Sequence, residues 1–477
     1  MISERFEAVV NRIHNDVRFQ YAILIGITLL AGGIRFYKLG AWSLWIDEIF
    51  TINRAKIHIN LETLIAQWWH PSISLILTNG VIEVFGFSAW TARLASALIG
   101  IVSIPILYFP IKRLLGSMVA LIAMLLLAVS PWHLEWSQNA RYYTSQLLLY
   151  FLAAYAFFLA MEKDRTRYLL LSGVLLVLAI GERFTAVFLA PVVLVYLVSL
   201  VLLPIEKPVG FKARNIALIL VPGIGFGLVE IIRFLSTGSS YITGAAELLY
   251  SLPIDDPFRL AIFIAYDIGV PLLCLGVFAG IYLLLQKSRI GLFVMINAIV
   301  PVVLLVLVNP FYFTKDRYIF MVLPFWLILA AVGIQEISVR MKGSGRMLAI
   351  GVLVLLLADA GGANLMYYRV NHGNRHDWKS AFALVQERSQ PGDQYVTWWT
   401  EFGPYYLDQE IISWGDIDPE FVKNSGQRFW FILDEENIWG NRPMKRWLEQ
   451  NGDLIDVIYL RRQNNVYLRV YLYDPGR

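Results

Sequence analysis

The acidic pair Asp47 and Glu48 in the segment WSLWIDEIF offers the first acid–base chemistry in the chain. One carboxylate can accept a proton while its neighbour orients a substrate or raises the pKa of its partner. Trp42 and Trp45 flank the pair, and aromatic residues concentrate at membrane–water interfaces. The pair is therefore a candidate catalytic site, although an ordinary solvated loop would also carry these residues.

Two later segments, SPWHLEWSQNARYY and GERF, bring further polar side chains between apolar runs. Glu135 and Asn139 are four residues apart and share one face if the segment is helical. Arg141 follows them, and the second segment contributes Glu182 and Arg183. Interface anchoring or a local ion pair explains the same residues, so both interpretations stay open.

The segment TKDRY places Lys315 and Arg317 beside Asp316 and Tyr318, just before a late apolar run. Two cations at this position suggest an anionic partner, and a lipid phosphate is the natural candidate. The alternative is that both cations pair with Asp316 or with other carboxylates.

The composition indicates an integral membrane protein. The 477 residues are 57% apolar and 16% charged, whereas a soluble domain is roughly 45–50% apolar and about 25% charged. Disorder is excluded because it requires low hydrophobicity and high net charge, and the net charge is only +4. The lone Cys274 cannot form an intrachain disulfide, and no spacing fits a zinc site, a P-loop or a dinucleotide fingerprint.

About eleven apolar runs reach the length of roughly 20 residues that a membrane helix needs. The predicted spans are Phe19–Tyr37, Trp90–Ile111, Ser117–His133, Tyr142–Met161, Tyr168–Gly181, Thr185–Leu203, Asn215–Phe234, Leu260–Leu285, Gly291–Asn309, Tyr318–Gln335 and Met347–Met366.

Basic residues gather in every second connection, which identifies the cytoplasmic side. They are Arg5, Arg12, Arg18, Lys112, Arg113, Lys163, Arg165, Arg167, Lys207, Lys212, Arg214, Lys287, Arg289, Arg340, Lys342 and Arg346. We therefore expect a multi-pass protein of the cytoplasmic (inner) membrane. Its amino terminus, which shows no cleavable signal peptide, is cytoplasmic, and the odd count of spans places the carboxyl-terminal part outside.

Two regions differ from this transmembrane pattern. The first outer loop, residues 38–89, contains apolar stretches at Leu61–Trp69 and Ser72–Phe85 that are too short to span and are expected to lie on the interface. After a membrane domain of residues 1–370, residues 371–477 are expected to form a small extracytoplasmic α/β domain. Its predicted helices are Asp377–Arg388 and Arg442–Gln450, and its strands lie in PGDQYVTWW, FWFILDEE and VIYLRRQNNVYLRVYLYD.

Together these motifs resemble the GT-C superfamily of membrane glycosyltransferases, in the branch of protein O-mannosyltransferases and lipid A aminoarabinose transferases. The resemblance rests on the order of W-x-DE, His70–Pro71, RLASALIG, SPWHLEWSQNARYY and a late DRY before a span containing Pro324. Related sequences commonly carry a second proline where this chain has Ser72. They often carry a glutamate at Asn139, and Glu135, one turn earlier, is a candidate to replace it.

The resemblance implies an enzyme that moves a hexosyl or pentosyl unit from a polyprenyl-phosphate-linked donor to an acceptor hydroxyl, with inversion. Asp47 would be the general base, with Glu48 and Glu135 as further catalytic residues. The donor phosphate would bind a cationic and phenolic set: Arg141, Lys315, Arg317 and Tyr318. The substrate would contact His70, Asn139, Tyr143 and Glu182.

The expected partners are the donor lipid, the membrane and a lipid, glycan or protein acceptor, with no nucleic acid. No metal ligand set is indicated, and because some GT-C members use a divalent metal, metal dependence stays open. Two other hypotheses fit parts of the pattern. A flippase for lipid-linked glycans would place charges inside its spans and often show inverted repeats. A non-catalytic assembly protein would depend on its outer domain rather than on Asp47.

Overall fold

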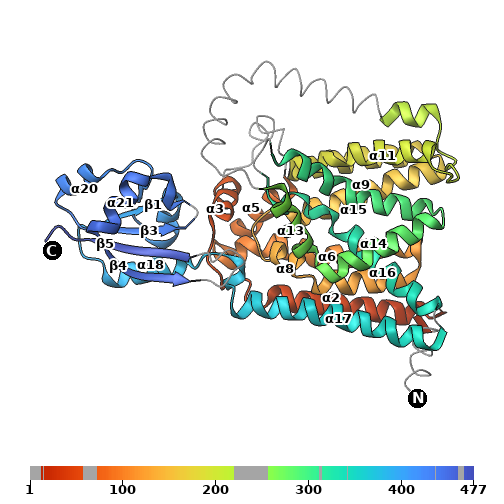
Figure 1. Ribbon diagram of the computed structural model, residues 1–477, viewed down its shortest axis with the longest axis horizontal. Coiled ribbons are helices and arrows are strands. Elements are labelled where there is room, and N and C mark those ends of the chain that lie inside the picture. The colour runs from red at the N-terminus through yellow and green to blue at the C-terminus, as the bar shows by residue number, and fades with distance from the viewer. Residues whose placement is uncertain are drawn as a thin grey trace.

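The computed structural model describes residues 12–13, 15–56, 72–219, 256–310, 314–340, 342–435, 437–459 and 467–476. A bundle of long helices carries a smaller sheet domain at one end (Figure 1). The predicted fold class, a polytopic helical membrane protein with a small α/β domain, is thereby confirmed.

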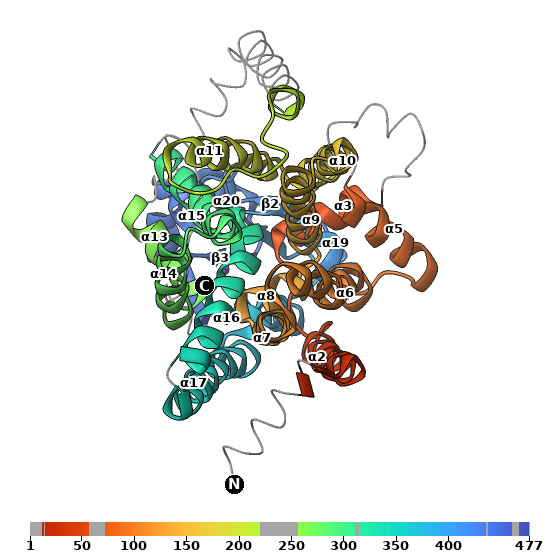
Figure 2. The ribbon, with the colours of Figure 1, turned by 90° about the vertical axis from the view of Figure 1, so that its right-hand side faces the viewer.

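Long apolar helices lie side by side in the bundle, as the view along their axes shows (Figure 2). Seven described stretches are long and apolar enough to cross a membrane, or up to nine if each of two bent helix pairs forms one span. The seven are α2 (Val17–Phe36), α6 (Ala89–Leu115), α9 (Tyr143–Lys163), η1 and α11 (Phe184–Phe188 and Leu189–Leu202), α15 (Arg289–Val308), η2 and α16 (Asp316–Val322 and Leu323–Arg340), and α17 (Lys342–Arg369). Each matches a predicted span in position.

Two further predicted spans have a less direct counterpart in the structure. The run predicted at Tyr168–Gly181 forms α10 (Thr166–Glu182), a 17-residue helix packed against α9. The run predicted at Asn215–Phe234 lies mostly outside the described residues.

The predicted span Ser117–His133 is broken. It forms α7 (Ser117–Val129) and α8 (Pro131–Ser137), which meet at 59°. Pro131 cannot donate to the preceding turn, so the helix cannot continue straight through it. Buried Arg35 of α2 donates to the carbonyl oxygens of Leu127 (3.3 Å) and Ala128 (2.9 Å) that the break releases. In an apolar surrounding such carbonyl groups need a donor from within the protein.

The predicted span Leu260–Leu285 is also divided, into α13 (Pro257–Ile268) and α14 (Val270–Leu285) at 91°. Gly269 joins them with a φ of +96°, a conformation that favours glycine. The length of the apolar run did not predict this corner, because a straight and a bent run have the same mean hydropathy.

The first predicted outer loop contains two described helices, α3 (Ile46–Ala55) and α5 (Ile73–Phe85). The predicted stretch Leu61–Trp69 lies outside the described residues. The stretch at Ser72–Phe85 forms α5, capped by the Ser72 side chain, and its 13 residues are too few to span. Helix α3 was not predicted, and it carries both residues of the acidic pair in its first turn.

The carboxyl-terminal part forms a five-stranded sheet with the order β2-β1-β3-β5-β4. Strand β1 pairs in parallel with β2 and β3, whereas β5 pairs antiparallel with β3 and β4. The strands are β1 (Gln394–Thr397), β2 (Ile412–Ser413), β3 (Phe429–Asp434), β4 (Asp453–Tyr459) and β5 (Tyr467–Tyr473). The helices are α18 (Trp378–Arg388), α19 (Gly403–Tyr406), α20 (Pro419–Ser425) and α21 (Arg442–Asn451).

This domain was largely predictable. Asp377 caps α18 as expected, with its side chain accepting from the Ser380 amide. All residues of β3 are buried, and they alternate between two apolar clusters, with Trp430 in one and Phe431 in the other. A strand buried on both faces reads as a continuous apolar run. The turn expected at Asn464–Asn465 lies outside the described residues, and the short β2 and α20 were not predicted.

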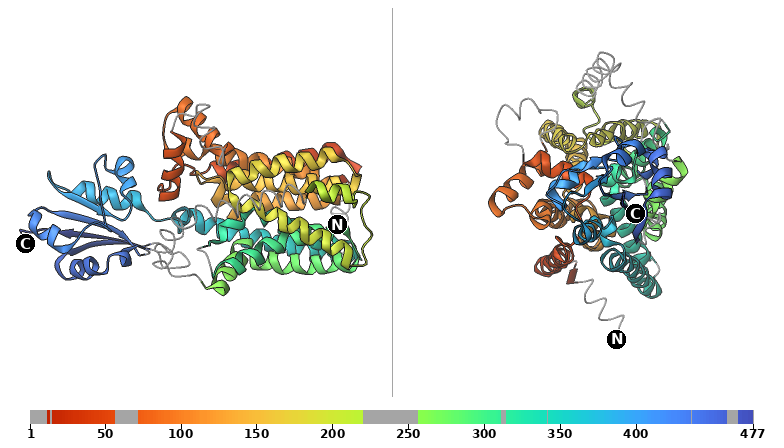
Figure 3. Two further views of the ribbon diagram at one scale, coloured as in Figure 1. Left: turned by 90° about the horizontal axis from the view of Figure 1, so that it is seen from above. Right: turned by 90° about the vertical axis from the view of Figure 1, so that its left-hand side faces the viewer.

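The sheet domain packs directly on α3. Ile49 and Ile52 of α3 belong to the same buried apolar cluster as Trp378 and Phe402 of the sheet domain. The Tyr406 hydroxyl also donates to the carbonyl oxygen of Leu44 at 3.0 Å. Figure 1 labels α3 at the end of the bundle that faces the sheet, and Figure 3 shows the sheet domain at that same end from two further sides. The helix that carries the acidic pair is therefore held from both sides.

The basic connections lie together at the far end of the bundle from α3. Arg289 at the start of α15 pairs with Glu162 near the end of α9 at 3.0 Å. Arg214 pairs with Asp164 at 3.3 Å. Helix α9 runs from this end to Tyr143 at the other. The structure thus places the basic connections and the segment that carries Asp47 at opposite ends of the bundle, as the alternation of charge predicts.

Candidate active site

Asp47 lies in the first turn of α3, where its carboxylate meets two arginines from other parts of the chain. The Oδ2 atom of Asp47 lies 3.4 Å from Nη2 of Arg317 and 3.8 Å from Nη2 of Arg141. Arg141 also donates to the Asp47 carbonyl (2.8 Å) and to the Thr51 hydroxyl (2.7 Å). The Asp47 side chain keeps 24% of its surface exposed. It is therefore both fixed in place and accessible to a substrate.

A third arginine, Arg183, extends this cationic group. It donates to the Tyr142 hydroxyl and, at 3.4 Å, to the Tyr143 hydroxyl. Its guanidinium lies 3.7 Å from the centre of the Tyr318 ring, a cation–π contact. The Tyr142 hydroxyl also accepts from Arg141 at 2.8 Å. Arg183 was noted in the sequence but not predicted as a site residue, because its neighbour Glu182 offered a simpler local partner.

The three arginines leave hydrogen-bonding capacity unused. The Nε atoms of Arg141, Arg183 and Arg317 are buried, with no hydrogen-bond partner in the part of the chain that the structure describes. Buried donors are normally satisfied. With two nearby carboxylates, Asp47 and Asp316, against three guanidinium groups, the region still carries an excess of positive charge and can bind an anion.

Asn139 supports this group through Trp45. Its Oδ1 accepts from the Trp45 Nε1 at 2.9 Å, and the Arg317 guanidinium lies 5.2 Å from the centre of the Trp45 ring. Tyr143 is fully buried, and the centre of its ring lies 4.2 Å from the centre of the Trp136 ring. These positions fit a supporting role better than the predicted direct contact with substrate.

Glu48 points away from Asp47 into a buried ion-pair cluster. Its side chain is 0% exposed and binds Arg93 in a two-pronged arrangement at 2.7 and 2.8 Å. The Glu48 carboxylate also pairs with Arg375 at 2.9 Å and accepts a hydrogen bond from the Ala140 amide at 2.8 Å. Burial by itself raises the pKa of Glu48, but the two guanidinium groups and these hydrogen bonds hold the pKa below its ordinary value. The predicted catalytic role does not fit a carboxylate without access to substrate; its position fits a role in fixing α3.

The other two predicted glutamates also have structural partners. Glu135 accepts from the Asn374 side chain at 2.7 Å, in the connection to the sheet domain. Glu182 is buried and accepts from the Ser72 and Ser74 hydroxyls at 2.6 and 2.7 Å and from the Ser74 amide at 3.0 Å. It therefore anchors the first turn of α5, where a negative charge is favourable. Neither contact supports the predicted catalytic or substrate-binding assignment.

The remaining predicted residues are placed as follows. Lys315 precedes η2, and its backbone carbonyl accepts from the Tyr318 amide at 3.0 Å. Its half-buried side chain lies two positions before Arg317. His70 lies outside the described residues. Within the described ranges, no group of three or more His, Cys, Asp or Glu side chains could hold a metal ion. The neighbours of Asp47 are arginines, which do not bind cations.

The comparisons with known proteins agree with this architecture. ArnT from Cupriavidus metallidurans, bound to undecaprenyl phosphate, superimposes with a TM-score of 0.59 at 14% identity over 94% of this chain and 97% of that chain. The chain has the fold of the GT-C membrane glycosyltransferases. The oligosaccharyltransferase of Archaeoglobus fulgidus, in complex with Zn and sulfate, matches with a TM-score of 0.54 at 12% identity, covering 94% of this chain and 72% of that one.

Sequence comparisons point to the same superfamily. Residues 70–225, about a third of the chain, match the family model for dolichyl-phosphate-mannose-protein mannosyltransferase. Dolichyl-phosphooligosaccharide-protein glycotransferase 2 of Pyrococcus furiosus is 25% identical over 190 residues. That alignment covers 39% of this chain and 22% of the relative, so the chain spans only about a fifth of the curated relative it matches. The predicted resemblance to GT-C glycosyltransferases is confirmed.

Proposed function

We propose that this protein is a glycosyltransferase that moves a sugar from a polyprenyl-phosphate-linked donor to an acceptor hydroxyl. The observation that carries the proposal is the accessible Asp47 carboxylate held between Arg141 and Arg317. A carboxylate beside an excess of guanidinium groups provides a proton acceptor and an anion site in one place. ArnT, whose fold this chain shares, was crystallised with undecaprenyl phosphate, which is the kind of lipid phosphate that such a site would bind.

The donor phosphate would compete with Asp47 for the two arginines. A phosphate offers more acceptor oxygens than a carboxylate and pairs well with guanidinium groups. When Arg141 and Arg317 turn to the phosphate, the Asp47 carboxylate is released from its ion pairs and is free to accept a hydrogen bond from the acceptor hydroxyl. Donor binding would thus prepare the proton acceptor for the next step.

In the proposed reaction, Asp47 accepts the proton of an acceptor hydroxyl as that oxygen attacks the anomeric carbon. The bond from the anomeric carbon to the phosphate oxygen breaks on the opposite face, so configuration inverts. The leaving group is a polyprenyl phosphate, and its developing charge lies against Arg141, Arg183 and Arg317. One well-placed donor of this kind contributes roughly 2.7–4 kcal/mol to lowering a barrier.

The reaction is proposed to occur at the outer face of the cytoplasmic membrane. Asp47 lies at the opposite end of the bundle from the basic connections, and basic connections are typical of the cytoplasmic side. The sheet domain, packed on α3, would then be extracytoplasmic.

Donor consumption tests the proposed activity directly. The purified full chain in lipid nanodiscs is mixed with a set of undecaprenyl-phosphate-linked hexoses and pentoses and with a pool of lipid, glycan and protein acceptors. Released undecaprenyl phosphate is measured by mass spectrometry. We expect release from at least one donor, and a fall of about 100-fold or more for Arg317→Ala. A flippase would leave every donor chemically intact, and that result would overturn the proposal.

A further inference from the structure

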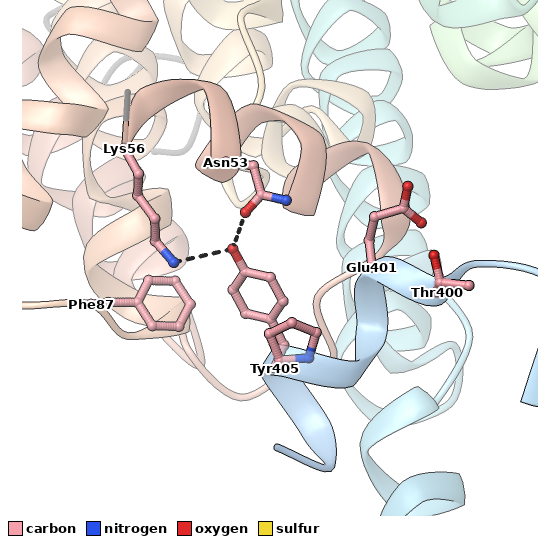
Figure 4. Close-up of a pocket in the computed structure, with 7 residues that line it drawn as sticks. Asn53, Lys56, Phe87, Thr400, Glu401 and Tyr405 are labelled. Atoms are coloured by element: carbon pink, nitrogen blue, oxygen red, sulfur yellow. Dashed lines mark hydrogen bonds between the residues drawn. The ribbon is translucent and has the colours of Figure 1, made fainter. Parts of the chain in front are cut away.

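A cavity of about 300 Å³ lies where the sheet domain meets α3, outside the cluster that surrounds Asp47. Its lining residues come from α3, from the connection before α6 and from the short helices of the sheet domain. They include Asn53, Lys56, Phe87, Thr400, Glu401 and Tyr405, which Figure 4 shows around the cavity. We propose that this cavity binds a sugar unit of the acceptor, so that the acceptor is a glycan of two or more linked sugars. The proposal rests on the glycosyltransferase function.

The chemistry of the lining suits a saccharide. Phe87 and Tyr405 supply aromatic rings for the apolar face of a sugar ring, as small-molecule sites generally combine aromatic walls with a few polar groups. Thr400, Glu401 and Lys56 supply a hydroxyl, a carboxylate and an ammonium group. Sugar hydroxyls both donate and accept hydrogen bonds, so they can pair with all three. The volume lies at the lower end of the range for small-molecule sites, roughly 300–1,000 Å³.

Part of the cavity wall is fixed by its own hydrogen bonds. The Tyr405 hydroxyl donates to Asn53 Oδ1 at 2.5 Å and accepts from Lys56 Nζ at 3.2 Å, as Figure 4 shows. Burial raises the pKa of Tyr405 to about 12, so this hydroxyl keeps its proton. Lys56 also lies 4.6 Å from the centre of the Phe87 ring. A wall ordered in advance reduces the entropy cost of binding.

Two polar side chains of the lining remain available to a ligand. Within the described part of the chain, the Thr400 hydroxyl and the Glu401 carboxylate make no side-chain hydrogen bond or ion pair with another residue. Both belong to η4 (Thr400–Phe402), which Phe402 anchors in the apolar core. Their backbone is thus fixed while their polar groups are free to bind sugar hydroxyls.

The position of the cavity relative to Asp47 specifies the length of the acceptor. Asp47, Phe50 and Asn53 are spaced by three residues, so they form one row along α3 from the carboxylate to the cavity. Neighbours in such a row are about 5–6 Å apart at their Cβ atoms, which puts the cavity roughly 10–12 Å from Asp47. That is longer than one pyranose ring. Phe50 is 37% exposed, and its ring is nearly perpendicular to that of Trp399, with the ring centres 6.1 Å apart. The two rings provide an aromatic surface between Asp47 and the cavity.

Glycan binding by matched variants tests the proposal. The full chain in nanodiscs, fluorescently labelled, is applied to an array of immobilised mono- to tetrasaccharides. We compare wild type, the double variant Thr400→Val/Glu401→Gln and a control, Glu410→Gln, whose residue is exposed outside the cavity. Two lost hydrogen bonds of about 1 kcal/mol each predict a weakening of about tenfold or more for the double variant.

The expected result is binding of disaccharides and longer glycans by wild type and Glu410→Gln, with loss confined to the double variant. Absence of glycan binding by wild type would overturn the acceptor site, as would equal binding by wild type and the double variant. Donor consumption is measured on the same samples. Failure of the transferase function would appear there as intact donor in wild type, whereas failure of the acceptor site alone would leave donor consumption in place.

Discussion

Glu48 and Arg375 form a buried ion pair of 2.9 Å between residues 327 positions apart. Glu48 follows Asp47 on α3, and Arg375 lies in the connection between α17 and the sheet domain. The Arg375 guanidinium also donates to the backbone carbonyl oxygen of Gln138 at 3.4 Å. This pair therefore links the start of the sheet domain with the helix that carries the proposed base.

Replacing Arg375 should impair catalysis although its side chain contacts Glu48 and not Asp47. Arg375→Gln removes one cation from the buried Glu48 carboxylate, and an unsatisfied buried group costs about 1–3 kcal/mol. We expect a lower thermal unfolding midpoint and a kcat reduced by about tenfold, with the KM for donor little changed, because α3 loses a fixed position. Arg388→Gln, at the exposed end of α18, is the matched control. Equal kcat values in the two variants would contradict a positioning role.

Acid should weaken the fold through Glu48. Its pKa in the folded protein is held below the unfolded value, which is about 4.3. The stability that Glu48 contributes is therefore present above about pH 4.3 and is lost as the pH falls through the folded pKa. Unfolding midpoints of wild type and Glu48→Gln between pH 7 and pH 3 should differ most at neutral pH and converge in acid. A difference that stays constant with pH would argue against this linkage.

Arg183 should contribute to donor binding although it does not touch Asp47. Arg183→Gln keeps a hydrogen-bond donor for Tyr142 and Tyr143 but removes the charge. We expect affinity for undecaprenyl phosphate, measured by competition against a labelled donor, to fall by about tenfold, while the protein remains folded. Lys287→Gln, at the basic end of the bundle, tests whether any lost cation has the same effect. Similar losses in both variants would mean that Arg183 has no specific role.

Asn139 should act through Trp45. Asn139→Leu removes the acceptor of the Trp45 Nε1 proton, and Trp45 then no longer holds its ring beside Arg317. We predict a higher KM for donor and a shift in intrinsic tryptophan fluorescence. Asn139→Asp keeps an acceptor oxygen and should preserve both properties. If Asn139→Leu matches wild type in KM, the contact between Trp45 and Arg317 has no part in donor binding.

Hydropathy and charge alternation were sufficient to predict most of the bundle, because a membrane helix needs a long apolar run and basic connections stay on one side. They did not show the corners at Pro131 and Gly269, since an apolar run has the same mean hydropathy whether or not it bends. The apolar strand β3 and the capped helix α18 of the sheet domain were also predictable, because a strand's apolar run and a helix cap are both local features of the sequence. Helix α3 was missed because its ten residues mix apolar and charged side chains.

The site was predicted only in part. Asp47, Arg141 and Arg317 come together as expected, whereas the roles assigned to Glu48, Glu135 and Glu182 do not fit their contacts. Those three carboxylates have partners far along the chain, and sequence spacing carries no signal for such pairs. One signal was available: Arg93 lies inside an apolar span, where a charge requires a partner, and that partner is Glu48.

In the proposed reaction Asp47 accepts the proton in sugar transfer while the arginines hold the donor. The most direct test is single-turnover donor consumption by Asp47→Asn, compared with Asp408→Asn, an exposed aspartate of the sheet domain, with undecaprenyl-phosphate affinity measured on the same samples. Loss of a general base predicts a rate lower by about 10²–10⁴-fold, with lipid affinity retained or increased, and a control equal to wild type. A rate for Asp47→Asn within a few-fold of wild type, with the lipid bound, would contradict a role of Asp47 as the proton acceptor.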